Sequence, residues 1–455
     1  MQLPLLLLLL KGVLLGCIAG SRAAAIYMNF TVNLSHPFKL PQWTMEIQVG
    51  TPPQPFFVSV DSGYPGLVLP TRTNFPKTVC RLDGMPDQRY DFNTSSTAAW
   101  FTCADAKRQG VTECDNCGNT NTSFSGKNPC RKGPSAFVAD TVRLGNGVIL
   151  PKYKFQVLDV AYPNFGFKVH AQDPHAPPLT QLMRDLKRKG LISALSYSAC
   201  FNATMGQGIV KIGDAQGVVT SMCSTKEAMH RLKNFTTSVS LGGVPVNFKG
   251  NKAASLFNPP STLAVKFDTG SLMTRFPPSM EESFRRLLER NCSSNPLVGV
   301  CNTSSHQPVD PQDSILNGTC YFLTEAQRRA FPDILIQIPA VNVSDPPYVL
   351  RYTSNDYLTN WRNYPCTWSL ATEGQIYPMP RSCVGSDKFM VTWGFAASQH
   401  LGIPGHLIFG KDIYNRFMHS VDYENHILYV APKFSSINSL RNNPNTKIIL
   451  NNTEE

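Results

Sequence analysis

Beyond its first residues, the sequence lacks any apolar run long enough to cross a membrane. A spanning helix needs about 20 consecutive apolar residues, and the leucine-rich run covers only Leu3 to Leu15. The sequence also lacks a dense block of lysine and arginine, because Lys187-Arg188-Lys189 is a short cluster of the kind found on one solvated helix face. These absences argue against a membrane-spanning protein and against a nucleic-acid-binding surface.

Charged residues are few as well, at 16% of the chain against 42% hydrophobic residues. This balance excludes a disordered chain and favours a globular protein with large cores. The 455 residues are enough for two or three domains. The net charge of +11 is compatible with acidic partners or a glycan matrix, but solubility is the simpler interpretation.

The apolar run at the start of the chain predicts a secretory signal peptide. It ends in small residues around Ala19 to Ala25, and we expect cleavage near Ala23. No basic residue precedes the run and Lys11 interrupts it, which is unusual for such a signal. The expected location of the mature protein is extracellular (secreted) or lysosomal.

Cysteine usage agrees with export. Of the 13 cysteines, Cys17 lies in the predicted signal, which leaves an even number in the mature chain and predicts disulfides. The segment Cys114-Asp115-Asn116-Cys117 has the spacing of half a zinc site, but no second such pair lies nearby, so we favour a disulfide-rich loop. Acceptor sequences for N-glycosylation predict a glycoprotein. They begin at Asn29, Asn33, Asn93, Asn121, Asn202, Asn234, Asn291, Asn302, Asn317, Asn342 and Asn451.

Two similar stretches, far apart in the chain, carry the candidate chemistry. The first is Phe57-Val58-Ser59-Val60-Asp61-Ser62-Gly63, and the second is Leu263-Ala264-Val265-Lys266-Phe267-Asp268-Thr269-Gly270-Ser271. In each, an apolar run typical of a buried strand ends at an aspartate, which is followed by a hydroxyl residue and a glycine. A proline lies nine positions after each aspartate, at Pro70 and Pro277.

The repeated aspartate fits a paired-carboxylate site. Two aspartates held about 3 Å apart cannot both ionise, so they share one proton. One then acts as a base toward a water molecule while the other donates a proton to a carbonyl oxygen. Glycine lets the backbone come close, and the hydroxyl can bond across to the opposite loop. The predicted catalytic pair is Asp61 and Asp268, with water as the nucleophile and no cofactor or metal.

The two stretches resemble the active-site arms of pepsin-like aspartic proteases. The turn Val49-Gly50-Thr51-Pro52-Pro53-Gln54 before the first aspartate adds to the resemblance, which covers roughly residues 40 to 434. It implies an all-β, bilobal fold: two pseudo-twofold-related β lobes with a few short helices. It also implies a monomer that holds a peptide or protein substrate in the cleft between the lobes.

The resemblance also implies roles for the residues around the pair. Ser62 and Thr269 would brace the two loops, Gly63 and Gly270 would allow their close approach, and Ser271 would support Asp268.

On this basis we divide the chain into four segments. They are a signal peptide (1–23), an N-terminal β lobe with the Asp61 arm and a cysteine-rich insert at 80–130 (24–225), a C-terminal β lobe with the Asp268 arm (226–436) and a polar tail (437–455). Family zymogens carry a basic pro-segment before the first lobe. Little chain separates the predicted cleavage from the strand expected at Trp43 to Val49, so we do not expect inhibition by such a segment.

Two helices are expected among the strands. One follows Pro178, with Thr180 as its N-cap and Gly190 as its stop. The other begins at a capping box of Ser279 and Glu282 and runs to about residue 289.

The first arm departs from the family pattern, whereas the second arm keeps it. Tyr64 stands where the family has a supporting serine or threonine, and Val68 stands where it has a tryptophan. The run Val157-Leu158-Asp159 resembles the strand that crosses beside the first loop, with Asp159 where that strand has glycine. In the second arm, Ile408-Phe409-Gly410 matches this crossing element.

The tyrosine of the family's flap, the hairpin that closes over the substrate, has no counterpart here. Phe124 or Asn128 is the nearest residue by spacing. Without a hydroxyl at position 64, an oxygen of Asp61 is expected to lack a donor, which would slow catalysis roughly tenfold to a hundredfold.

Three functions fit this sequence. The first is an aspartic endopeptidase that works at acid pH, attenuated by the changes in the first arm. The second is a weakened or inactive relative that binds peptides or proteins, and the third is a carrier of a small ligand or lipid. Both aspartates are present, which favours the peptidase.

Overall fold

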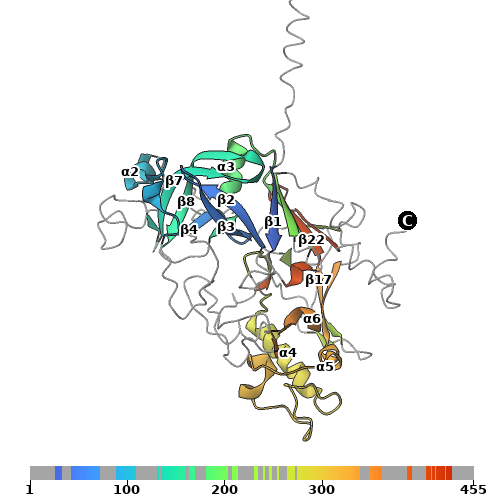
Figure 1. Ribbon diagram of the computed structural model, residues 1–455. Helices are drawn as coiled ribbons and strands as arrows, with labels where there is room; N and C mark the ends of the chain where they lie inside the picture. The colour runs from blue at the N-terminus through green and yellow to red at the C-terminus, as the bar shows by residue number, and fades with distance from the viewer. Residues whose placement is uncertain are drawn as a thin grey trace, which may run out of the picture.

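The structure is a computed structural model of the chain (Figure 1). It describes residues 26–32, 43–71, 89–108, 131–132, 135–158, 163–169, 181–202, 207–213, 230–233, 239–240, 245–247, 254–255, 264–271, 274–338, 348–360, 387–391, 406–410, 412–415, 417–425 and 427–432.

Strands dominate this part of the chain, and its helices are short. The strands are β1 (Ile26–Val32), β2 (Trp43–Val49), β3 (Gln54–Asp61), β4 (Leu67–Pro70), β5 (Ala99–Trp100), β6 (Arg131–Lys132), β7 (Ser135–Arg143), β8 (Ile149–Leu158), β9 (Asn164–Gly166), β10 (Ser196–Asn202), β11 (Gln207–Ile212), β12 (His230–Lys233), β13 (Val239–Ser240), β14 (Pro245–Asn247), β15 (Ala254–Ser255), β16 (Ala264–Phe267), β17 (Asp333–Ile338), β18 (Tyr348–Tyr352), β19 (Leu358–Asn360), β20 (Phe389–Val391), β21 (His406–Phe409), β22 (Phe417–Asp422) and β23 (Ile427–Pro432). The α-helices are α2 (Cys103–Arg108), α3 (Leu182–Arg188), α4 (Pro278–Arg290), α5 (Glu325–Ala330) and α6 (Ser354–Tyr357). The 3-10 helices are η1 (Phe92–Thr94), η2 (Gly145–Gly147), η4 (Pro311–Asp313), η5 (Ile315–Asn317) and η6 (Ile413–Asn415).

The largest sheet in the described ranges has 14 strands, in the order β12-β23-β22-β10-β11-β1-β2-β3-β9-β4-β8-β7-β5, with β6 beside β7. Alternating side chains explain how it packs. In β2, alternate apolar residues from Trp43 to Val49 are buried, while Glu46 and Gln48 between them are exposed. A period of two is what a sheet needs when one face covers a core.

The two aspartate arms belong to different sheets. β3 lies in the large sheet, antiparallel to β2 and parallel to β9. β16 lies in a separate sheet of order β13-β16-β21 and runs parallel to β21. The late strands β22 and β23 return to the large sheet, where β22 pairs with β10. Figure 1 shows β1 to β4, β7, β8 and β22 in the upper part of the molecule and α4, α5 and α6 at its lower end.

Both predicted helices are present, but their predicted N-caps are wrong. α3 has Gln181 as its N-cap with no capping side-chain hydrogen bond, and Thr180 lies outside the described residues. α4 begins after Pro277, again without a capping side chain, so Ser279 and Glu282 form no capping box. Pro278 takes the first position of α4, where the missing N–H of proline costs no hydrogen bond.

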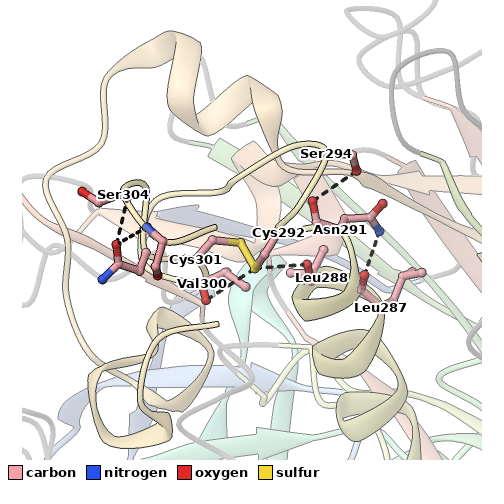
Figure 2. Close-up of a disulfide and its surroundings, with 10 residues drawn as sticks. Leu287, Leu288, Asn291, Cys292, Ser294, Val300, Cys301 and Ser304 are labelled. Atoms are coloured by element: carbon pink, nitrogen blue, oxygen red, sulfur yellow. Dashed lines mark hydrogen bonds between the residues drawn. A yellow bond between two sulfur atoms is a disulfide. The ribbon is translucent and has the colours of Figure 1, made fainter. Parts of the chain in front are cut away.

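A disulfide closes the loop that follows α4. Cys292 and Cys301 are bridged, with their Cα atoms 5.4 Å apart (Figure 2). Cys103, Cys200 and Cys320 are disulfide-bonded as well. The prediction of disulfides is therefore confirmed for these cysteines. Within the described ranges, no helix combines the length and the apolar character needed to cross a bilayer.

We expect the bridge to restrain residues 292–301 strongly. Its partners are separated by 9 positions in sequence, and closing so short a loop contributes about 2–3 kcal/mol. Replacing both Cys292 and Cys301 by alanine should therefore speed local backbone hydrogen exchange about 30- to 150-fold. Ser294→Ala, at an exposed position in the same loop, is the control. Equal exchange in the two variants would contradict the expectation.

Candidate active site

The first arm is a strand end held between two neighbours. In the parallel pairing of β3 with β9, Ser59 lies opposite Asn164 and Asp61 opposite Gly166. The chain then passes so close to β9 that a Cβ at position 166 would overlap the backbone of Tyr64. Glycine is therefore needed at 166 for the Asp61 loop to lie against β9.

The second arm repeats this arrangement. Phe267 pairs with Phe409 in the parallel ladder of β16 and β21, and the N–H of Asp268 donates to the Phe409 carbonyl at 3.0 Å. Gly410 follows at the position that corresponds to Gly166. The dipeptide Phe-Gly thus occurs in both crossing strands, at 165–166 and at 409–410.

This pairing corrects the prediction for residues 157–159. Val157 and Leu158 belong to β8, which pairs with β4 rather than with β3. The strand beside the Asp61 loop is β9, and its glycine is Gly166. Asp159 therefore does not stand at the crossing glycine, and it lies outside the described residues.

Reciprocal hydrogen bonds join the two arms. The Ser62 N–H donates to Thr269 Oγ1 at 2.8 Å, and the Thr269 N–H donates to Ser62 Oγ at 2.9 Å. Each hydroxyl then donates onward: Ser62 Oγ to the Phe267 carbonyl (3.0 Å) and Thr269 Oγ1 to the Val60 carbonyl (2.9 Å). Both hydroxyl residues are buried. Each loop therefore satisfies buried backbone groups of the other.

Glycines in the two loops allow each carboxyl group to pack against the opposite loop. A Cβ at Gly63 would overlap the carboxyl of Asp268, and a Cβ at Gly270 would overlap the carboxyl of Asp61. Each carboxyl therefore rests directly on the opposite loop. Asp61 is 8% exposed.

Hydrogen bonds hold both carboxyl groups. Asp61 accepts from the Gly63 N–H at Oδ1 (2.6 Å) and from the Asn164 side-chain amide at Oδ2 (2.6 Å). Asp268 accepts at Oδ1 from the N–H groups of Gly270 (3.0 Å) and Ser271 (3.1 Å). The expected gap at the Asp61 carboxyl is therefore closed by Asn164, which the sequence pattern did not single out. The Phe-Gly dipeptide at 165–166, which also occurs in the second arm at 409–410, is the sequence signal that could have located this strand and the preceding Asn164.

Tyr64 turns its hydroxyl away from this contact. It donates to Gln156 of β8 in a short hydrogen bond. Burial and the nearby charge of Asp61 raise the pKa of Tyr64 to about 12, so its phenol stays neutral. Val68 is buried, and it pairs with Asn164 across the β4–β9 ladder. The flap candidates, Phe124 and Asn128, lie outside the described residues.

A buried aromatic layer supports the two loops. Tyr197 hydrogen-bonds with Ser62, and its hydroxyl lies 3.1 Å from Nε2 of His419. The His419 ring stacks on Tyr414 and on Phe267, the residue before Asp268. Burial raises the pKa values of Tyr197 and Tyr414 well above the usual range. The phenols of Tyr197 and Tyr414 therefore stay neutral. Through Tyr197 of β10 and His419 of β22, this aromatic layer connects both arms to the large sheet.

Asp412 braces the second arm from behind. Its Oδ1 accepts from the N–H (2.9 Å) and the hydroxyl (2.8 Å) of Thr274, whose hydroxyl in turn accepts from the Gly410 N–H (3.1 Å). Tyr352 donates a short hydrogen bond to its Oδ2. Part of the residue reaches solvent, but the carboxyl is enclosed, and burial raises the pKa of Asp412 to about 6.

The arrangement suits acid–base chemistry on a water molecule between two carboxyl groups. In the part of the chain that the structure describes, no group of three or more histidine, cysteine, aspartate or glutamate residues could hold a metal ion.

Comparison with solved structures identifies the fold. The chain matches the crystal structure of an aspartic proteinase from Irpex lacteus with a TM-score of 0.51 and 15% sequence identity, over 90% of this chain and 98% of that chain. No family model and no curated protein matches the sequence. The predicted fold class, the all-β, bilobal fold of pepsin-like aspartic proteinases, is confirmed.

Removing the hydroxyl of Thr269 should weaken the junction of the arms. Thr269→Val leaves the Ser62 N–H and the Val60 carbonyl without this partner, at about 1–3 kcal/mol for each buried group. We expect the free energy of unfolding to fall by about 2–4 kcal/mol in chemical denaturation. The control, Thr71→Val, removes the hydroxyl that donates to the Leu158 carbonyl, and that carbonyl keeps its bond from the Thr71 N–H. If both variants lose the same free energy of unfolding, the hydrogen bonds of Thr269 do not stabilise the junction of the arms as we expect.

The raised pKa of Asp412 predicts a pH-dependent stability. Folding favours its protonated form, so its contribution should weaken as the pH rises from about 4 to about 6 and stay constant above that. Because the pKa of Asp412 rises from its ordinary value to about 6, the loss of stability over this range is on the order of 3 kcal/mol. Asp412→Asn should remove this dependence in thermal melts across that range, whereas the exposed control Asp310→Asn should keep it. The same pH dependence in wild type and Asp412→Asn would refute this assignment.

Proposed function

We propose that this chain is an aspartic endopeptidase that hydrolyses peptide bonds with a water molecule activated by Asp61 and Asp268. The observation that carries the proposal is the contact of each carboxyl with the glycine of the opposite loop, fixed by the reciprocal bonds of Ser62 and Thr269. This contact supports the proposal, because two acidic groups that act on one water molecule must lie on adjoining loops.

In this mechanism the pair shares one proton. The ionised carboxyl takes a proton from the water as its oxygen attacks the peptide carbonyl carbon, and the protonated carboxyl gives its proton to the carbonyl oxygen. The resulting tetrahedral diol collapses when one carboxyl gives its proton to the leaving nitrogen and the other takes a proton from a diol hydroxyl. The C–N bond then breaks, the C=O bond re-forms, and the pair again holds one proton. The proton balance closes within the pair.

The neighbouring residues position the pair. Ser62 and Thr269 hold the loops in register, Gly63 and Gly270 permit their approach, and Ser271 supports Asp268 through its backbone N–H. We assign the Asp61 arm to a lobe of residues 24–225 and the Asp268 arm to a lobe of residues 226–436, with an extended peptide bound between them.

Acid pH suits this proposal. A pair that shares one proton needs a pH low enough to keep that proton bound. Asp412 behind the second arm is also protonated below about pH 6, where its enclosed carboxyl carries no unfavourable charge.

We further propose that the protein acts in a lysosome or outside the cell. The disulfides support an oxidising route of synthesis. Asn93, Asn302 and Asn317, three of the predicted glycan acceptors, are exposed.

A second candidate is a peptide-binding relative with little activity. The observation that favours it is Tyr64, whose side chain fills the place of a small hydroxyl residue and donates to Gln156 instead of Asp61.

Proteolysis of denatured globin between about pH 3 and 6 tests the first candidate against the second. We expect cleavage that a statine-type inhibitor blocks. The cleavage rate should fall at least about a thousandfold in Asp61→Asn and in Asp268→Asn, because an amide cannot take up and give back the proton as a carboxyl does. The exposed control Asp310→Asn should keep wild-type activity. Inhibitor binding without cleavage at any pH would instead support the peptide-binding relative.

A further inference from the structure

Asn164 lies on the same sheet face as Asp61. In β9 it pairs with Ser59 of β3 on one side and with Val68 of β4 on the other. Ser59 and Asp61 are two positions apart, so their side chains share a face of β3, and the side chain of Asn164 shares that face too.

The amide of Asn164 donates to the Asp61 carboxyl. Its Nδ2 donates to Oδ2 at 2.6 Å, while Oδ1 accepts from the Gly63 N–H at 2.6 Å. An ionised carboxylate is purely an acceptor, so the nitrogen end of the amide must face it. Both oxygens of Asp61 thereby receive an N–H, which stabilises the anion.

The other end of the amide gains nothing from this position. Oδ1 of Asn164 is buried and has no hydrogen-bond partner among the described residues. A buried polar atom without a partner weakens a fold, and an apolar residue of similar size would avoid that loss. Packing alone therefore does not account for an asparagine here, whereas its contact with Asp61 does.

We propose that Asn164 is a positioning residue that supplies the hydrogen bond to Asp61 which Tyr64 does not give. Tyr64 donates to Gln156 instead, so the donor has moved from the loop after Asp61 to the strand beside it. The inference rests on the proposed function. In the first arm a donor from β9 orients the Asp61 carboxyl toward the water molecule that it would activate.

Asn164→Leu tests this directly, because leucine keeps the volume and removes the donor. We expect kcat/KM to fall about tenfold to a hundredfold, mostly in kcat, since one bond to a charged group is lost. The acid limb of the pH–rate profile should move to higher pH, because the anion has lost a donor. Asn164→Asp, whose carboxyl donates only when protonated, should keep activity at the lowest pH and lose it steeply as the pH rises.

The chain offers a matched control. Asn425 donates from Nδ2 to Oδ2 of Asp422 at 2.7 Å, in the turn between β22 and β23. Asn425→Leu removes the same kind of bond far from the candidate catalytic pair in sequence and should leave the pH–rate profile in place. Tyr64→Ser should raise the activity of Asn164→Leu by a larger factor than that of the wild type, because a hydroxyl at 64 would restore a donor.

Thermal stability separates this inference from the proposed function. The Asn164 bond is stronger while Asp61 is ionised, so the melting temperature of Asn164→Leu should fall further below wild type at about pH 7 than near pH 2. If the wild type shows no proteolysis, but its melting temperature still differs from that of Asn164→Leu more at about pH 7 than near pH 2, the peptidase is refuted and the Asn164–Asp61 contact is supported. A melting difference that is equal at both pH values, or a pH–rate profile identical to wild type, would overturn the inference.

Discussion

The structure depends on the exchange of hydrogen bonds between Ser62 and Thr269. Each hydroxyl receives the N–H of the other residue and donates to a backbone carbonyl on the opposite strand. Because these backbone groups are buried, neither loop can withdraw without stranding polar atoms of both. The glycines then set the spacing, and each carboxyl comes to rest on the other loop. Strand ends from two separate sheets are thereby held as one site.

The first arm reaches this geometry by a different route from the second. Backbone N–H groups of its own loop donate to Asp268, whereas the donors to Asp61 include a side-chain amide from a neighbouring strand. The large residue Tyr64 is accommodated because Gln156 receives its hydroxyl. The departures of the first arm in sequence are thus linked in space: β9 lies between β3 and β4, and β8 lies beside β4.

The features that could be predicted from the sequence are local or repeated. Alternating apolar residues locate β2 and β3, and the doubled Asp-hydroxyl-Gly motif locates both arms. The crossing strand is misplaced by sequence pattern because Val157 and Leu158 have the same apolar character, and only the pairing of β8 with β4 separates them from β9. Asn164 cannot be assigned to Asp61 without that cross-strand register. The pair Tyr197 and His419 joins residues so distant in sequence that no local pattern relates them.

The central claim is that Asp61 and Asp268 grip a single water molecule, and a crystal structure with a statine-type inhibitor at acid pH tests it most directly. The inhibitor's hydroxyl takes the place of that water. We expect its oxygen to lie within about 2.6–3.2 Å of a carboxyl oxygen of each aspartate. A hydroxyl bound to one carboxyl alone, or carboxyl groups too far apart to share it, would contradict the account.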